Sequence, residues 1–443
     1  MSNFINKYLI GIVIGFHITL YFTSIFIFKT NIPWVDDWQW IENLQTNEIS
    51  TYKWLLKLEN IHNHFTVKLI LLFSKFYLNF NFQFFSYLSI TLLFSSSILL
   101  YRNLASQNIS IFFISLLLVI LFSSKQFPSI SQMSNLSWFI CFFLIILYYS
   151  VFNLEKIKIS KIICLIFSPL TLGFGVLLPL YTILLVVIKY NFSKSHLLYF
   201  VTSILSLIFA FIIPRLISNE IDSAISYNFF DNLSYIIIFK IIFTFFALLG
   251  SLCLPWIEKI NILAFCIGFL QFAFLFSYLF LKINKSRRKI KSLILFFEDN
   301  MLIILGLLFA LVVSLSRAEW NTSIQPRYST GVIIFYIGYF LYFYKEFKSK
   351  NIFYLFQNIT SLYVILIFLV GNFSPYLGLH WQVTKSFNSN RVIECFVMNE
   401  KIDDCISIAY NVLFYEGKWY DYNKFSEQIY ILKNKKEIFF IDK

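Results

Sequence analysis

Residues 8–28 of the chain read YLIGIVIGFHITLYFTSIFIF and contain no Asp, Glu, Lys or Arg. A helix of about 21 residues, rising roughly 1.5 Å per residue, crosses the ~30 Å hydrocarbon core of a bilayer. No small-residue cleavage site follows this run, so we interpret it as a retained first span and not as a signal peptide. It indicates a protein built around membrane-spanning helices.

The composition of the whole chain supports this fold class. Of the 443 residues, 58% are hydrophobic and 13% are charged, whereas soluble domains are about half apolar and a quarter charged. We expect an all-α integral membrane protein with about 11–12 transmembrane helices. The candidate spans are residues 8–28, 82–101, 109–123, 136–152, 161–173, 175–189, 196–213, 233–254, 260–281, 300–316, 329–345 and 352–371.

The charge distribution predicts an orientation. The net charge is +13, and short basic runs such as KINKSRRKIK (282–291) and KEFKSK (345–350) separate the spans. Nucleic-acid binding is not expected, because no basic face accompanies a soluble domain. Basic loops stay in the cytoplasm, so we expect an inner (cytoplasmic) membrane protein. The segments placed outside are then 29–80, 124–135, 317–328 and 372–443.

One part of the chain conflicts with strict alternation. Two apolar segments lie between Pro214 and the basic run at 282–291, and two crossings would place that run outside. Either one of the segments is re-entrant, or residues 161–189 cross once with a break at Gly173 and Gly175. The sequence leaves both alternatives open.

We divide the chain into a transmembrane domain, residues 1–371, and an outer C-terminal tail or small lid, residues 372–443. In the first outer loop, 29–80, we expect interfacial helices, because Lys68 and Lys75 lie seven residues apart on one helical face and can point toward water. If the tail lies outside the cytoplasm, its Cys395 and Cys405 can form a disulfide.

Asp36 and Asp37 form the first candidate site, in the motif WVDDWQW, with Trp38 beside them. A carboxylate just outside the hydrocarbon can act as a general base toward a hydroxyl, or bind a divalent metal together with a phosphate. The alternative is an acidic helix cap flanked by interfacial tryptophan anchors. We take the two acids as candidate catalytic residues.

His62 and His64 follow in the turn HNHF. Imidazole can donate to phosphate or sugar oxygens and can shuttle a proton. The alternative is a polar turn that starts the next helix. The spacing of two residues is poor for shared metal binding on one helix, so we predict no zinc site.

Arg317, Arg327 and Tyr328 lie in the late outer loop SRAEWNTSIQPRYST, residues 316–330. Two arginines at outer span ends oppose the inside-positive bias. A phosphate ligand accounts for them, because guanidinium groups bind phosphate oxygens through paired donors. The alternatives are an ion pair with Asp36, Asp37 or Glu319, or contact with lipid phosphates.

Two further residues are weaker candidates. Gln132 belongs to a polar outer loop that can line a sugar site, and Lys240 interrupts an apolar run. An ionisable residue in such a run is a functional candidate that faces a cavity, with snorkelling to the interface as the alternative. We group both with Trp38 and His62 as candidate substrate-lining residues.

With these residues in place, the chain resembles the type-C (GT-C) superfamily of polytopic membrane glycosyltransferases. The matching pieces are WVDDWQW after the first span, the HNHF turn ahead of an interfacial helix, the GFG break at 173–175, and the Arg–Tyr pair in QPRYST. The resemblance covers about residues 1–371. In that superfamily an arginine often follows the position of His64, whereas here Phe65 follows it. The C-terminal tail has no counterpart in the superfamily.

The resemblance implies a function. The donor would be a polyprenyl-phosphate-linked sugar, and the acceptor a glycan, lipid or protein on the outer face of the cell envelope. Asp36 or Asp37 would be the catalytic base, and Arg317, Arg327, Tyr328 and His64 would hold the donor phosphate. No cofactor is required by this scheme, and metal dependence is left open. The alternatives are a lipid-linked glycan polymerase or ligase, or a flippase for lipid-linked glycans.

Overall fold

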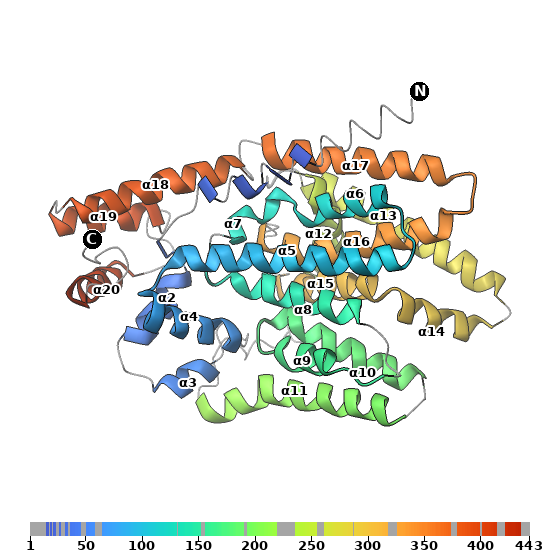
Figure 1. Cartoon of the computed structure of the whole chain (residues 1–443), viewed down its shortest axis with the longest axis horizontal. Helices are drawn as coiled ribbons and strands as arrows, with labels where there is room; N and C mark the ends of the chain where they lie inside the picture. Colours follow the sequence, from blue (N-terminus) through green and yellow to red (C-terminus); the bar gives the residue numbers. More distant parts are fainter. Residues whose placement is uncertain are drawn as a thin grey trace.

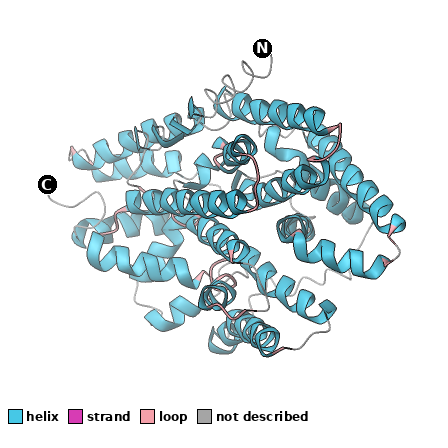
Figure 2. Ribbon diagram, turned by 45° about the vertical axis from the view of Figure 1, so that its right-hand side comes forward, coloured by secondary structure: helices cyan, strands magenta, loops and turns pink. Residues whose placement is uncertain are grey.

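The computed structural model of the chain consists of helices and the turns between them, with no strand in the part that it describes (Figures 1 and 2). The described residues are 15–16, 18–19, 21–23, 26–27, 32–33, 36–45, 50–57, 64–130, 132–151, 156–189, 193–218, 235–254, 261–286, 288–317, 326–373, 379–398, 401–413 and 421–435.

Side-chain caps help to fix where several helices begin. The Asn81 side chain accepts a hydrogen bond from the backbone N–H of Gln83, and Ser110 accepts one from the N–H of Phe113. The elements in chain order are α2 (Asp36–Gln45), α3 (Thr51–Leu56), α4 (Phe65–Leu78), α5 (Phe82–Ser106), α6 (Ile111–Leu121), η1 (Ser124–Gln126), α7 (Phe127–Ile130), α8 (Leu136–Ser150), α9 (Ile159–Phe167), η2 (Gly173–Val176), α10 (Leu177–Lys189), α11 (Lys194–Ser218), α12 (Tyr235–Gly250), η4 (Ser251–Cys253), α13 (Asn261–Lys285), α14 (Lys289–Asp299), α15 (Met301–Arg317), η6 (Pro326–Tyr328), α16 (Ser329–Phe347), α17 (Phe353–Phe373), α18 (Leu379–Val397), α19 (Ile402–Leu413) and α20 (Tyr422–Lys435).

Fewer helices reach full membrane-spanning length than the 11–12 expected. Among the described residues, α5, α11 and α13 are long and apolar enough to cross a membrane, and α14 with α15 passes only as a pair bent by 83°. The predicted spans at 109–123 and 136–152 form apolar helices of 11 and 15 residues, α6 and α8. A perpendicular crossing needs about 20 residues. The predicted first span, 8–28, lies mostly outside the described residues.

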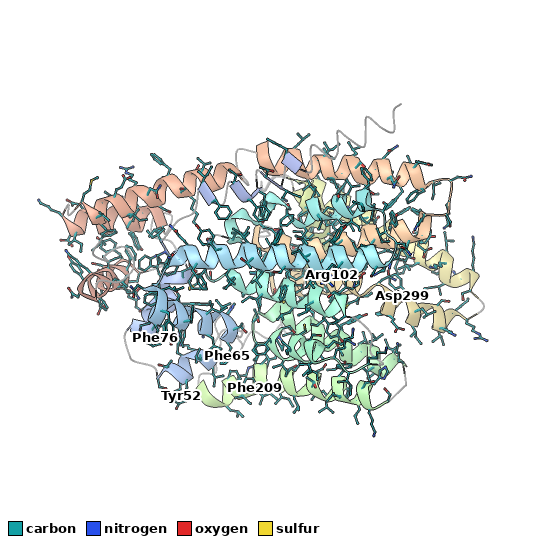
Figure 3. All side chains as sticks on the ribbon, viewed as in Figure 1. Tyr52, Phe65, Phe76, Arg102, Phe209 and Asp299 are labelled. Carbon is teal, nitrogen blue, oxygen red and sulfur yellow. A yellow bond between two sulfur atoms is a disulfide. The ribbon has the colours of Figure 1, made fainter. Side chains whose placement is uncertain are left out.

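The basic loops gather at one end of the helix bundle, which we call the basic end. Lys282 of α13 pairs with Glu346 of α16, and the Lys348 ammonium donates to a backbone carbonyl in the turn between α5 and α6. Arg102 and Asp299 lie toward this end in Figure 3, whereas Tyr52 and Phe76 of the first loop lie toward the other. Basic runs that are far apart in the sequence therefore share one end.

The opposite end, which we call the polar end, carries α2, α7, η6 and the tail helices α18 to α20. Figure 1 shows α2 and the tail helices together at the left of the view, with α13 and α14 at the right. The helices α5, α8, α10 and α16 run between the two ends. The segments in which the sequence predicted outer loops thus lie opposite the basic runs.

The chain path accounts for the conflict in alternation. The end of α11 packs beside α3 of the first loop. η4 lies against η1, where the Lys125 ammonium donates to the carbonyl of Ser251. The chain is therefore at the polar end both at residue 218 and at residue 254, with no net crossing between them. α13 then carries it back to the basic end, and KINKSRRKIK joins the other basic runs.

The two lysines of α4 do not point toward water as expected. Lys68 is fully buried, and its ammonium donates to the carbonyls of Trp54 (2.9 Å) and Lys57 (2.7 Å) at the end of α3. Lys75 donates to the carbonyl of Leu44 (3.1 Å) near the end of α2. A helix end has carbonyls without partners in the helix, and a cation there is favourable. The lysines therefore fix α2 and α3 onto α4.

We predict that Lys68→Met destabilises the protein by about 2–4 kcal/mol, because the buried carbonyl of Trp54 and the partly buried carbonyl of Lys57 each lose a charged donor. Lys53→Met is the matched control, since Lys53 is exposed on α3, and it should change stability by less than about 0.5 kcal/mol. Thermal unfolding of the purified protein in detergent measures both. Equal melting temperatures for the two variants would contradict the proposed role of Lys68.

Candidate functional site

Asp37 joins the first loop to the segment between α7 and α8. Its carboxylate accepts hydrogen bonds from the backbone N–H groups of Ser134 (2.8 Å) and Met133 (3.2 Å), and the side chain is 1% exposed. Two backbone N–H donors fix the position and orientation of the carboxylate. This contact brings together the WVDDWQW motif and the loop that contains Gln132, about 100 residues apart in the sequence.

His64 stands at the start of α4, where the HNHF turn meets the segment before the GFG break. Its ring lies 5.0 Å from that of Trp40 in α2. Two residues later, the backbone N–H of Thr66 donates to the carbonyl of Leu170 (3.2 Å). The Thr66 hydroxyl accepts a hydrogen bond from the Thr171 hydroxyl (3.1 Å). The turn that carries His64 is thereby tied to both α2 and the approach to η2.

An aromatic cluster connects the GFG break to the late loop. Trp138 of α8 contacts Phe174 of η2 at 6.1 Å, Phe309 of α15 at 5.8 Å and Tyr328 of η6 at 5.8 Å. The contact with Phe174 is stacked and the other two are edge-to-face, and both kinds stabilise the packing beyond the area they bury. The Arg327 guanidinium lies over the Tyr328 ring at 5.7 Å and is partly exposed. Arg327 therefore keeps contact with the surface of the polar end while its neighbour is held in the core.

A polar contact holds η6 beside η1. Thr330, at the start of α16, bonds to the Gln126 side chain (3.1 Å), whose amide also donates to the carbonyl of Leu121 (2.7 Å). Gln132 is partly buried and accepts a hydrogen bond from the Asn135 side chain. The segment 124–135 thus lies between α2, which carries Asp37, and η6, which carries Arg327.

The tail contributes a buried lysine that interacts electrostatically with Asp37. Lys385 lies on α18 and is 3% exposed. Burial lowers the pKa of Lys385 well below its usual range, while the negative charge of Asp37 opposes that shift. α18 also packs against α7, which leads into the Met133–Ser134 turn. Lys385 and Asp37 therefore interact electrostatically across the contact between the tail and the first loop.

A second set of contacts fixes the tail to α2. The Trp38 ring meets Phe425 of α20 edge-on at 4.9 Å, and the indole N–H donates to the carbonyl of Pro33 (3.0 Å). Lys424 lies 3.7 Å from Glu42. Trp38 has no exposed surface, and its ring is held between the first loop and the tail.

A disulfide closes the tail. Cys395 of α18 and Cys405 of α19 are bonded to each other. Tyr430 of α20 donates to the Asp403 carboxylate (2.7 Å), and Tyr410 of α19 contacts Phe425 at 5.9 Å. The three tail helices are therefore cross-linked to one another and, through Phe425 and Lys385, to the first loop.

Of the four remaining predicted residues, three have side chains outside the described part of the chain. His62 lies outside the described residues, and the side chains of Asp36 and Arg317 do so as well. Asp36 is the first residue of α2, and Arg317 is the last of α15. Lys240 is partly exposed and lies ten residues before Gly250, which places it about 15 Å along α12 from the polar end.

Lys385 was not singled out in the sequence. It stands in a helix of mixed polarity, LHWQVTKSFNSNRVIECFV, with no motif around it. Its only sequence signal is that a solitary lysine lies on the same helical face as Ser389 and Val392, which are also buried. The sequence does not reveal that α18 packs against α7, so it gives no reason to select this lysine.

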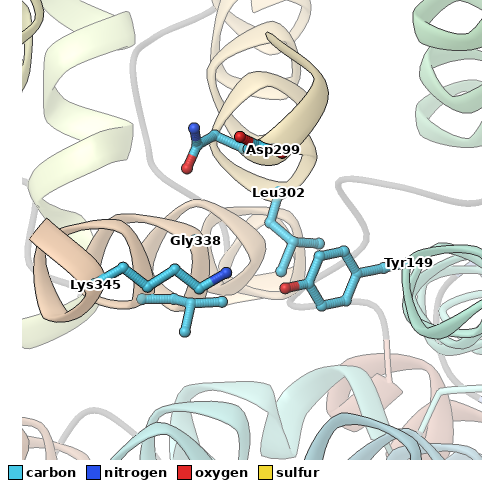
Figure 4. Close-up of a pocket in the computed structure, with 7 residues that line it drawn as sticks. Tyr149, Asp299, Leu302, Gly338 and Lys345 are labelled. Atoms are coloured by element: carbon cyan, nitrogen blue, oxygen red, sulfur yellow. The ribbon is translucent and has the colours of Figure 1, made fainter. Parts of the chain in front are cut away.

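The described residues contain no group of three or more His, Cys, Asp or Glu side chains that could hold a metal ion. A small pocket lies elsewhere, at the basic end, lined by residues of α8, α16 and the α14–α15 bend (Figure 4). Comparison of the chain with protein-family models, with curated proteins and with solved structures gives no match.

We predict that Asp37→Asn and Lys385→Met each destabilise the protein by about 3 kcal/mol, because each leaves its buried partner charge uncompensated. The double variant should lose clearly less than the sum. Glu42→Gln is the control for a surface pair and should cost less than about 0.5 kcal/mol. Thermal unfolding in detergent measures all four variants. Additive losses would mean that Asp37 and Lys385 are not coupled.

We also predict that replacing Cys395 and Cys405 together by serine lowers tail stability by about 2–3 kcal/mol, the value expected for a closed loop of this length. Limited proteolysis should then cut α18 and α19 faster than in the unaltered protein. Cys266→Ser, at an exposed free cysteine, is the control. Unchanged cleavage in the double serine variant would show that the bond does not hold the tail.

Proposed function

We propose that the protein is a membrane glycosyltransferase that moves a sugar from a polyprenyl-phosphate donor to an acceptor on the extracytoplasmic side of the cell envelope. The observation that carries the proposal is convergence at the polar end. WVDDWQW, HNHF, the GFG break and QPRYST are spread over residues 34–330, yet contacts between side chains and backbone join them there. Packing of a helix bundle does not require these four motifs to meet.

Two independent features support the orientation. Basic runs collect at the basic end, as expected for the cytoplasmic side. A disulfide lies in the tail at the polar end, and disulfides persist in oxidising compartments. Both features point the polar end away from the cytoplasm, where lipid-linked sugars would meet an extracytoplasmic acceptor.

The contacts also favour a division of roles between the paired acids. Asp37 is buried, accepts two backbone N–H groups and faces Lys385. A carboxylate so engaged is a positioning residue, because a general base needs access to the proton it takes. We therefore assign the base to Asp36 and the binding of the donor phosphate to Arg327, with Arg317 as a second cation.

In the proposed reaction the acceptor hydroxyl gives its proton to the Asp36 carboxylate, and its oxygen forms a bond to the anomeric carbon of the sugar. The bond between that carbon and the donor phosphate oxygen breaks. Arg327 stabilises the negative charge that develops on the departing phosphate. A lipid-phosphate donor needs no nucleotide pocket, and a direct displacement would invert the anomeric centre.

The glycans of a deletion strain, analysed by mass spectrometry, test the proposal. Loss of one defined sugar supports a transferase. Accumulation of short repeats identifies a polymerase, and lipid-linked intermediates retained inside the cell identify a flippase. An unchanged profile of glycans, lipid-linked sugars and glycosylated proteins would refute the proposed function.

We predict that Asp36→Asn and Arg327→Gln reduce the glycan modification by at least about 100-fold while the protein still accumulates in the membrane, since each removes a group that acts in the transition state. Glu42→Gln and Lys348→Gln are matched controls, one acid on α2 and one cation at the basic end. Mass spectrometry of the glycans in complemented strains gives the readout. Full modification with either of the first two variants would remove that residue from the reaction.

A further inference from the structure

α14 lies across the direction of the helix that follows it. The axes of α14 and α15 meet at 83° around Asn300. α15 packs antiparallel against α16, with Gly306 so close to Phe335 that an added Cβ would lie 2.4 Å from the Cβ of that residue. α15 therefore follows the bundle, and α14 runs nearly at right angles to it, at the basic end where α13 finishes.

The apolar residues of α14 continue a surface that α13 already exposes. On α13, a candidate membrane span, Phe276, Phe280 and Leu281 are each more than half exposed. On α14, Ile290 is 78% exposed and Leu293 is 44% exposed. These two residues share one face of the helix, because they are three positions apart. A bilayer around α13 would reach this face at the level where α13 ends.

Basic residues lie at the beginning of α14, and acidic residues lie at its end. Arg288, Lys289 and Lys291 are exposed at its beginning, next to Lys285 at the end of α13. Cations in the first turn and acids in the last turn oppose the helix dipole, so this order weakens an isolated helix. The stability of α14 itself does not account for the cations.

The far end of α14 is held by the protein. Glu298 pairs with Lys189 of α10, and the carbonyl of Phe297 accepts a hydrogen bond from Tyr181 (2.7 Å). Asp299 lines the pocket at the bend together with Lys345 of α16 (Figure 4). The acidic end is thus engaged with neighbouring helices, and the basic beginning faces outward.

We propose that α14 lies in the membrane surface and binds anionic phospholipid headgroups in the leaflet at the basic end. Its apolar face enters the boundary between headgroups and acyl chains, and Arg288, Lys289 and Lys291 contact the phosphates. An interfacial helix has this combination of an apolar face and a cationic border. The proposal rests on the chain spanning a membrane, not on the proposed glycosyl transfer.

Phosphatidylglycerol titrated into the full-length protein in neutral mixed micelles tests this, with retained lipid counted by native mass spectrometry. A basic residue near an anionic surface is worth about fivefold in binding. The lipid concentration for half-maximal retention should therefore rise roughly 100-fold in R288Q/K289Q/K291Q. A tail variant with the same loss of charge, R391Q/K401Q/K433Q, should bind like the unaltered protein.

A second variant, Ile290→Ser with Leu293→Ser, separates the apolar face from the charges. It should weaken retention of phosphatidylglycerol while leaving all the cations in place, and circular dichroism checks that each variant remains folded. The proposal is overturned if the triple variant retains the anionic lipid as well as the unaltered protein does. It is also overturned if the tail variant loses it equally, or if phosphatidylcholine is retained to the same extent.

Discussion

The carboxylate of Asp37 is the contact on which the polar end depends. It accepts hydrogen bonds from Met133 and Ser134 and faces Lys385, so one side chain connects the first loop, the segment before α8 and the tail. Breaking a buried charge pair costs more than forming it gains, because the partner is left desolvated. Asp37 therefore helps to specify the placement of α2, because another placement would leave Asp37 or Lys385 buried without its partner.

Around that contact the site is assembled from many short segments. Trp138 holds η2 and η6 together, Gln126 holds η1 against α16, and Lys68 and Lys75 fix α2 and α3 onto α4. The long helices make few of these contacts. They set the distance between the polar end and the basic end, and the loops at each end supply the chemistry.

The sequence predicted the helices and the grouping of basic runs well, because both follow from composition and local charge. Among the described residues fewer helices reach full spanning length than expected, since α6, α8 and α10 are apolar but short and gain stability by packing on neighbours. The sequence missed the direction of Lys68 and the importance of Lys385. Both depend on carbonyls or carboxylates from distant segments, which local patterns do not contain. The contact of Trp38 with Phe425 was missed for the same reason, as Phe425 lies almost 400 residues away.

The contact between Trp38 and Phe425 has a consequence for biogenesis. A ribosome delivers α2 long before α20, so for most of synthesis the indole has no tail to pack against. The beginning of the protein can reach its final arrangement only after the last helices have emerged and, given the bond between Cys395 and Cys405, been oxidised. Folding of the first loop therefore depends on the C-terminal helices. A truncation there would leave Trp38 of α2 without its packing partner.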